Sequence, residues 1–300
     1  MLLSSTRFSQ GSVELHMHVA LEPEYALFYN RRRGLLYDNR YQPCSQAPSR
    51  GRVTFHTLLE GSLSTSNGLE VTGPALVCMS HDVFEGASGS RPETFRAHGE
   101  PHVSLTLHID RDWVVGDHEA APHLVTLSAE VERAAREYTA LAEGHGDTSA
   151  FERASSTLIA AFVRDGLLQQ RPRVPRTAAQ YGERIWNGLS VYVTQLDASP
   201  TLGMLSDLIN ISPRTADRLM KQLTETYGLP AEGFRDMIRR WRLKLATLLL
   251  SGRDLTVRVV AQRVGYRNAE ALANALAAEG LLAPSRYRQL WDEPYRNEKR

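Results

Sequence analysis

The feature that most constrains the fold is a pattern that occurs twice in the C-terminal part of the chain. Residues 201–228 ("TLGMLSDLINISPRTADRLMKQLTETYG") and 254–280 ("DLTVRVVAQRVGYRNAEALANALAAEG") each combine a short apolar helix, a tight break and a second helix with a polar face. Between them, residues 234–252 have the apolar spacing of one long helix that ends near Gly252. This is the pattern of two helix-turn-helix units joined by a helix, and it predicts an all-α region.

The second helix of the first copy has the more pronounced faces. Ser212 is a capping residue, and Pro213 stands where a first-turn proline is tolerated. The apolar stripe, at helical spacing, consists of Ala216, Leu219, Met220 and Leu223. The opposite face carries Arg214, Thr215, Arg218, Lys221 and Gln222. That face can meet either water or the edges of DNA bases, because the second helix of such a unit lies in the major groove.

The charge distribution favours the second of these alternatives. The net charge of the chain is only +1, but residues 1–170 hold 14 Lys and Arg against 21 Asp and Glu, whereas residues 171–300 hold 21 against 13. A basic half joined to an acidic half indicates that one half faces an anionic polymer. A chance drift of charge between domains is the alternative.

The helical half resembles the DNA-binding domain of the AraC/XylS transcription regulators over residues 195–290. The matching positions, in order, are "SPRT" at 212–215, Arg242, Leu243, Ala246, Leu249, Leu250, Ala261, Gly265, Tyr266, Pro284, Tyr287 and Arg288. The second unit departs from the family pattern, because Asn274 and Ala277 stand where basic residues are usual. We therefore expect the first unit to dominate sequence specificity.

This resemblance implies a bacterial, sequence-specific transcription regulator that binds double-stranded promoter DNA as a homodimer and contacts RNA polymerase. Arg214 and Arg218 are placed to donate to guanine or phosphate, and Gln222 can pair with adenine. Lys221 is expected on phosphate, and Thr215 on a thymine methyl. In the second unit the candidates are Arg267, Asn268 and Asn274. Arg242 has two alternatives: it contacts phosphate, or it holds the two units together through a buried carboxylate.

The N-terminal half is predicted to be β-rich, which makes the chain an α+β multidomain protein. Alternating apolar runs at 13–21, 52–63 and 102–110, and shorter runs within 69–86, are separated by turn residues. The rhythm of residues 54–86 is similar to that of cupins, so we expect a cupin-like barrel at 1–127 that senses a small-molecule effector or a partner. Ligand binding there is expected to shift the population of DNA-binding states.

Two helices are expected at 128–170, with a capping box at Ser149 and Glu152, as a dimerisation segment. "QQRPRVPR" contains two prolines, so residues 171–176 are expected to be a linker to the DNA-binding domain at 177–292. Residues 293–300 form a tail.

An alternative function is a metal-dependent cupin enzyme with an appended nucleic-acid-binding module. "HMHVALE" gives His16, His18 and Glu22 in an order that metal cupins use, and two imidazoles with a carboxylate suit iron, manganese or zinc. The motif lies some 40 residues before the cupin-like stretch, and two histidines on one strand face are equally typical of a half-exposed strand. We therefore expect no metal, no cofactor and no catalytic residues. His56 and His81 are candidates for binding a ligand near a barrel mouth, or for satisfying core groups.

"NRRRG" at 30–34 can bind an anion, form a solvated turn or contact the acidic surface of a partner subunit, and residues 1–12 can form an arm over the pocket. The chain shows no nucleophile elbow, no apolar run long enough for a membrane helix and no secretory signal. With only Cys44 and Cys78 it cannot form a disulfide framework, so a cytoplasmic location is expected.

Overall fold

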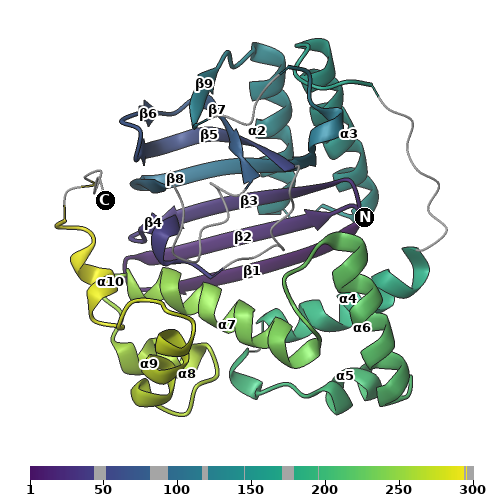
Figure 1. Ribbon diagram of the computed structural model, residues 1–300, viewed down its shortest axis with the longest axis vertical. Coiled ribbons are helices and arrows are strands. Elements are labelled where there is room, and N and C mark those ends of the chain that lie inside the picture. Colours follow the sequence, from purple (N-terminus) through teal and green to yellow (C-terminus); the bar gives the residue numbers. More distant parts are fainter. Residues whose placement is uncertain are drawn as a thin grey trace.

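The computed structural model describes residues 1–43, 52–81, 94–116, 121–144, 146–170, 179–194, 196–293 and 295. The α+β prediction is confirmed: an antiparallel sheet fills the N-terminal half, and the C-terminal half is helical (Figure 1). Cys44, the linker at 171–176, and residues 294 and 296–300 of the tail lie outside the described residues. Within the described part, no helix combines the length and apolar character needed to cross a bilayer.

The sheet follows one path, β1-β2-β3-β8-β5-β7-β9, with β4 paired to β8 and β6 to β5. In the described residues this path has two ends, β1 and β9, so the strands form an open sheet rather than the closed cupin-like barrel that we expected. The strands are β1 (Leu2–Gln10), β2 (Val13–Leu21), β3 (Tyr25–Arg33), β4 (Tyr37–Asp38), β5 (Arg52–Thr65), β6 (Glu70–Thr72), β7 (Ala75–Ser80), β8 (Phe95–Asp110) and β9 (His123–Val125).

Two of the possibilities that the sequence left open for the first 34 residues do not match the structure. Residues 2–10 are a strand of the sheet, not an arm, and residues 25–33 are a strand rather than a turn. Because side chains alternate across a strand, the three arginines of "NRRRG" are separated. Arg32 is paired with His102 of β8, and both side chains point to one face of the sheet, whereas Arg31 and Arg33 point to the other face.

The helices α2 (Ala129–Gly144) and α3 (Thr148–Arg164) cover one face of the sheet, which we call the outer face. Their apolar stripes, including Val131, Tyr138 and Phe162, share one core with the outer face (Figure 1). The expected cap is displaced: the carboxylate of Asp147, rather than Ser149, accepts the Ala150 amide at 2.7 Å. The apolar faces of the predicted dimerisation helices are thus covered by their own sheet.

The C-terminal half contains both expected helix-turn-helix units. The first is α5 (Leu202–Leu208) with α6 (Pro213–Tyr227), and the second is α8 (Val257–Arg263) with α9 (Ala269–Ala278). The helix α7 (Phe234–Leu250) joins them, α4 (Ala179–Thr194) and the short η3 (Leu196–Ala198) precede the first unit, and α10 (Arg286–Gln289) follows the second. In Figure 1 the two units lie at opposite ends of α7.

The two halves share a core. The opposite face of the sheet, which we call the inner face, packs against α4 and α7, so that Leu15 and Leu58 belong to the same buried cluster as Trp186 and Leu248. The helix α4 also lies along β1, where Trp186 Nε1 donates to the Leu3 carbonyl at 2.7 Å and Ser190 Oγ donates to it at 3.2 Å. The helical half is therefore docked on the sheet.

Candidate nucleic-acid interface and buried cavity

The helix α6 presents the polar face that its sequence predicts. Ser212 Oγ accepts the Thr215 amide at 3.2 Å, and Gly228 ends the helix with a φ of 61°, a left-handed conformation that suits glycine. The stripe of Ala216, Leu219, Met220 and Leu223 is buried. The opposite face therefore has a fixed direction, away from the core.

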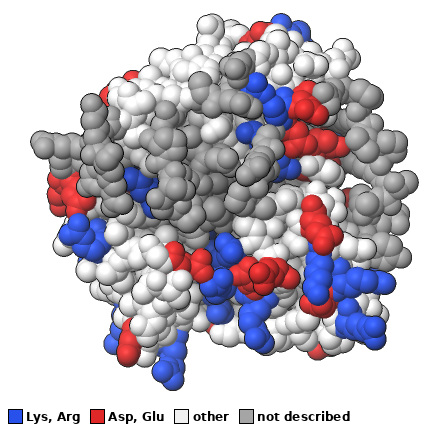
Figure 2. Space-filling model, viewed as in Figure 1, with Lys and Arg blue, Asp and Glu red and all other residues white. Residues whose placement is uncertain are grey.

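The residues expected to read DNA lie on that outward face. Arg214, Arg218, Lys221 and Gln222 are exposed, and Thr215 is half-buried. The only ion pair that α6 makes in the described residues is between Lys221 Nζ and Asp217, at 3.3 Å on the surface. Such a pair contributes little to stability, so the cation is available to a phosphate. In Figure 2 Lys and Arg gather in the lower part of the view, where Figure 1 places the C-terminal helices, with acidic side chains between them.

The second unit offers less charge. Arg267 and Asn274 are exposed, but Asn268 is the N-cap of α9, and its side-chain oxygen accepts the Ala271 amide at 2.8 Å. Only the amide NH₂ of Asn268 remains to donate to a base. Over α9 and its N-terminal turn, Arg267 is the sole cation up to residue 285. The expected weakness of base reading by this unit thus has a geometric basis.

Arg242 does not lie with the α6 face. Its Nη2 donates to the Leu196 carbonyl at 2.8 Å, and its guanidinium lies 5.9 Å from the centre of the Tyr266 ring. The side chain is half-buried, and burial lowers its pKa. Of the two sequence-based alternatives, this geometry favours the one that joins the two units, although a carbonyl oxygen and an aromatic ring take the place of the expected carboxylate.

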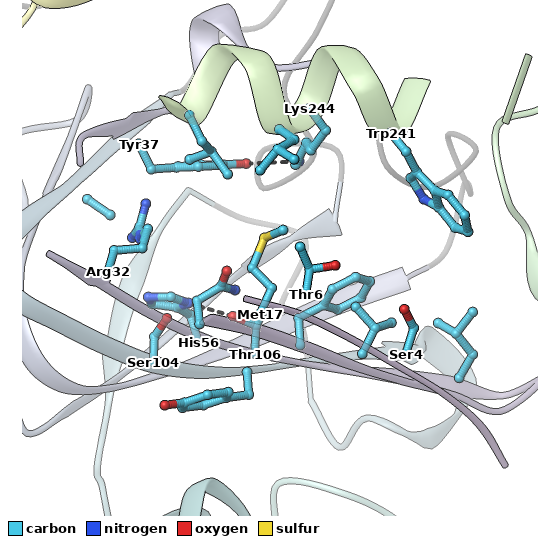
Figure 3. A pocket seen from close by; sticks show the side chains of 18 of the residues that line it. Ser4, Thr6, Met17, Arg32, Tyr37, His56, Ser104, Thr106, Trp241 and Lys244 are labelled. Atoms are coloured by element: carbon cyan, nitrogen blue, oxygen red, sulfur yellow. Dashed lines mark hydrogen bonds between the residues drawn. The ribbon is translucent and has the colours of Figure 1, made fainter. Parts of the chain in front are cut away.

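A cavity of about 140 Å³ lies between the inner face of the sheet and α7 (Figure 3). Its walls differ in character. One polar patch, on β3, β8 and β5, consists of Asn30, Arg32, Ser104, Thr106 and His56. The other described lining residues are mostly apolar and include Val19 and Leu21 on β2, Phe28 on β3, and Trp186, Trp241 and Leu248 on α4 and α7. Two cations reach this space, Arg32 from the sheet and Lys244 from α7, and none of its lining residues in the described part of the chain is Asp or Glu.

Arg32 is buried without an ion-pairing partner in the described residues. It is 4% exposed, and its Nε and Nη1 have no hydrogen-bond partner among the described residues. Burial lowers its pKa to about 10, which still leaves it charged at neutral pH. The guanidinium lies 5.3 Å from the centre of the Tyr37 ring. An aromatic face offsets only part of the cost of burying a charge, so the site favours an added anion.

Lys244 approaches the same aromatic ring from the other side of the cavity. Its Nζ lies 5.4 Å from the centre of the Tyr37 ring and 3.5 Å from the Tyr37 hydroxyl (Figure 3). The two cations therefore belong to different halves of the chain and share one aromatic neighbour. An anion near Tyr37 would interact with both, and the mostly apolar walls beyond it would cover an apolar body.

The two candidate histidines have different surroundings. His56 lines the cavity, its Nδ1 lies 2.9 Å from Thr106 Oγ1, and burial together with the Arg32 charge lowers its pKa to about 3. It is therefore neutral and can only exchange hydrogen bonds. His81 is fully buried beside His108, with 3.1 Å between their Nδ1 atoms, and is not among the residues that line the cavity.

The geometry does not bring the alternative metal ligands together. His16 and His18 lie on the outer face, as their shared parity on β2 requires, but His18 stacks on Phe151 and the His16 Nε2 accepts from Arg7 Nε at 3.2 Å. Among the described residues, no cluster of three or more His, Cys, Asp or Glu side chains has the arrangement of a metal site.

Comparisons with known proteins give distant likenesses. No family model matches the chain, and no curated protein matches it. Apo ToxT K231A from Vibrio cholerae strain SCE256 is similar over 93% of this chain and 98% of that one, with 10% identity and a TM-score of 0.36. Unsaturated fatty acid bound wild-type ToxT from the same strain is similar over 90% of this chain and 96% of that one, with 12% identity and a TM-score of 0.37. The transcriptional regulator CdpR from Pseudomonas aeruginosa is similar over 62% of this chain and 46% of that one, with 16% identity and a TM-score of 0.30.

Sequence reasoning missed most of the cavity. It considered an anion at "NRRRG" but did not single out Arg32, and it assigned no role to Tyr37 or Lys244. The available signal was parity. Once residues 25–33 are recognised as a strand, Arg32 must share a face with Ala26 and Phe28 and not with Arg31 and Arg33. Because Leu27 and Tyr29 make the other face equally apolar, this pattern separates Arg32 from its neighbours but does not show on which face the cavity lies.

Proposed function

We propose that this chain is a sequence-specific DNA-binding transcription regulator that responds to a small anionic ligand held between its two halves. The observation that carries the proposal is the pair of helix-turn-helix units on one connecting helix, with three exposed cations and Gln222 on the outward face of α6. In such units the second helix enters the major groove and its N-terminal turns meet the base edges.

In this proposal α6 supplies the specificity. Arg214 and Arg218 donate to guanine O6 and N7, Gln222 pairs with adenine, and Lys221 binds a phosphate. The second unit adds Arg267, the free amide of Asn268 and Asn274, and chiefly contacts the DNA backbone. Homodimerisation, contact with RNA polymerase and a cytoplasmic location, which the family resemblance implies, belong to the same proposal.

The effector follows from the cavity. Arg32 and Lys244 favour a carboxylate or a group of similar charge, and the apolar walls require a compact apolar body. The volume of about 140 Å³ is close to that of an engineered apolar cavity of about 150 Å³ that binds benzene. We therefore propose a small aromatic or short-chain carboxylate. A ligand that touches both halves affects how the DNA-binding half is held.

The test is a selection of duplexes from a random pool with the full-length protein, followed by footprinting and by affinity measurement at several salt concentrations. We expect a defined site that binds at least about 1,000-fold more tightly than random duplex. Arg218→Ala should weaken that site, whereas Arg133→Ala, an exposed arginine on α2, should not. Binding that is independent of sequence and is lost by about 200 mM salt would contradict the proposal, because it would reflect electrostatic attraction alone.

A further inference from the structure

We propose that Arg242 is a positioning residue that fixes the separation of the two helix-turn-helix units, and so sets the spacing between the two DNA elements that the protein accepts. This inference rests on the proposed DNA-binding function. It concerns neither base reading nor the ligand, but the register with which the two units reach the duplex.

A single guanidinium joins three parts of the helical half. Arg242 lies on α7 and its Nη2 donates to the carbonyl of Leu196, in η3 between α4 and the first unit, at 2.8 Å. The same nitrogen lies 3.5 Å from Ser199 Oγ. On its other side the guanidinium lies 5.9 Å from the Tyr266 ring, in the turn between α8 and α9. The segment before the first unit and the turn of the second unit thus meet at this side chain.

The turn of the second unit packs directly on this contact. Gly265 has a φ of 80°, and a Cβ at this position would overlap the Leu196 carbonyl oxygen and lie 2.6 Å from Arg242 Nη2. There is no room for the turn to approach further, and moving it away would take the Tyr266 ring from the half-buried guanidinium, which would keep only its contacts to the segment before the first unit. The separation of the units is therefore confined from both sides.

The surroundings of Arg242 argue against a direct role on DNA. Its Nε is buried and has no hydrogen-bond partner among the described residues, and its charge is placed against a carbonyl and an aromatic ring. Removing a charged donor from a buried acceptor costs more than removing a surface ion pair. By contrast, Arg240, two residues earlier, forms an ion pair with Asp236 of the same helix α7, at 3.0 Å.

A fixed separation has a consequence for DNA. One inserted base pair moves the second element by about 3.4 Å along the axis and turns it by about a tenth of a helical repeat. The second unit need not read bases to sense this change, because phosphate contacts also fix register. Two rigidly joined units should therefore tolerate one spacing, and two loosely joined units several.

The experiment uses the full-length protein and the duplex obtained by selection. Variants of that duplex carry one or two base pairs inserted or deleted between the two protected elements, and affinity is measured by fluorescence anisotropy. For the wild type we expect a single changed base pair to weaken binding about 10-fold, which corresponds to 1.4 kcal/mol. Arg242→Ala should bind the original duplex about 10-fold more weakly than the wild type does. Its affinities for the duplexes of different spacing should lie within about threefold of one another. The matched control Arg240→Ala should keep the wild-type spacing profile.

Each outcome bears on the proposal. An Arg242→Ala protein that binds more weakly but keeps the wild-type ratio between spacings overturns it, as does a selected site with only one protected element. If circular dichroism shows that Arg242→Ala does not fold, Arg242→Gln, which keeps one donor, is measured in the same way and should show a partly relaxed profile. A wild type that selects no sequence at all refutes the proposed function itself, which is a different result from a selected site with an unchanged profile in the variants.

Discussion

The proposed DNA-binding face of α6 and the proposed ligand cavity each contain cations, and the two groups of cations differ in burial. Arg214, Arg218 and Lys221 lie exposed on α6, where water solvates them before any partner arrives. Arg32 lies at 4% exposure under α7 and has lost most of that solvation already. Exposed cations therefore cost the fold little and give binding that depends on salt, whereas a buried cation destabilises the fold until an anion binds it.

The largest effect is expected from the exposed group. Arg218→Ala should weaken binding to the selected duplex about 10- to 100-fold, since a good bidentate pair with a base is worth about 1–3 kcal/mol. Anisotropy titrations with the selected and a random duplex provide the measurement. Binding to the random duplex should change less than about threefold, because one of many phosphate contacts is lost there. An equal loss on both duplexes would assign Arg218 to the backbone instead of a base.

For the buried group, a substitution that removes the charge should weaken ligand binding but stabilise the ligand-free protein. Arg32→Met removes a buried charge, so the unfolding free energy of the ligand-free protein should rise by about 1–3 kcal/mol. Urea unfolding at pH 7 gives this value, and Arg33→Met, an exposed neighbour on β3, should change it by less than about 0.5 kcal/mol.

The same variant tests the ligand class. Millimolar benzoate should raise the melting temperature of the wild type but not of Arg32→Met, while benzyl alcohol, which lacks the charge, should leave both nearly unchanged. A wild type that benzoate does not stabilise, or one that both compounds stabilise equally, would show that the charge in the cavity does not select the ligand.

Buried histidines predict a dependence of stability on pH. Burial lowers the pKa of His56 to about 3 and that of His18 to about 4, and it holds the pKa values of His102 and His108 well below 6.5. Between pH 6.5 and about 4 the unfolded chain therefore binds protons that the native protein does not, and stability falls as pH falls. Each such histidine contributes a slope of up to about 1.4 kcal/mol per pH unit.

Urea unfolding at a series of pH values measures this slope. His56→Gln should lower this slope by up to about 1.4 kcal/mol per pH unit relative to the wild type, which corresponds to one bound proton. Glutamine can keep the hydrogen bond to Thr106 but does not titrate. An unchanged slope in His56→Gln would mean that His56 is protonated in the native protein, and would place a third cation beside Arg32.

The smallest effect concerns salt. Lys221→Ala should reduce the slope of log affinity for DNA against log salt by about one unit, because one phosphate contact is lost. Benzoate binding, by contrast, should change less than about twofold between 50 and 200 mM salt, because a buried pair is screened little. A steep salt dependence of benzoate binding would remove the distinction between the two groups.

The helical half was largely predictable, because its elements are defined by local signals. Ser212 and Gly228 begin and end α6 as their residue types indicate, and the stripe from Ala216 to Leu223 faces the core. Capping and helical periodicity act within a few residues, so the sequence carries them directly. The exception is α3, where Asp147 competes successfully with Ser149 for the cap.

The cavity could not be predicted in the same way, because its parts come from distant segments. Arg32, Tyr37 and Lys244 approach one another only when β3, β4 and α7 are packed, and α7 reaches the sheet through the shared core. The first strand also resisted prediction, since Ser4 and Thr6 interrupt its apolar pattern where they line the cavity. Both sets of residues depart from the local pattern at a proposed site of function, where such departures are expected.

Because α4 lies along β1, the N-terminal half depends on the helical half to cover one edge of its sheet. β1 is one end of the sheet, and at this end Trp186 and Ser190 bind the Leu3 carbonyl. An uncovered edge strand is a template on which other chains add strands, and natural proteins shield such edges. Here the shield belongs to the helical half. A fragment that ends at the linker would expose β1 and self-associate through it, so the N-terminal half of this chain is best studied with the helices that protect its edge.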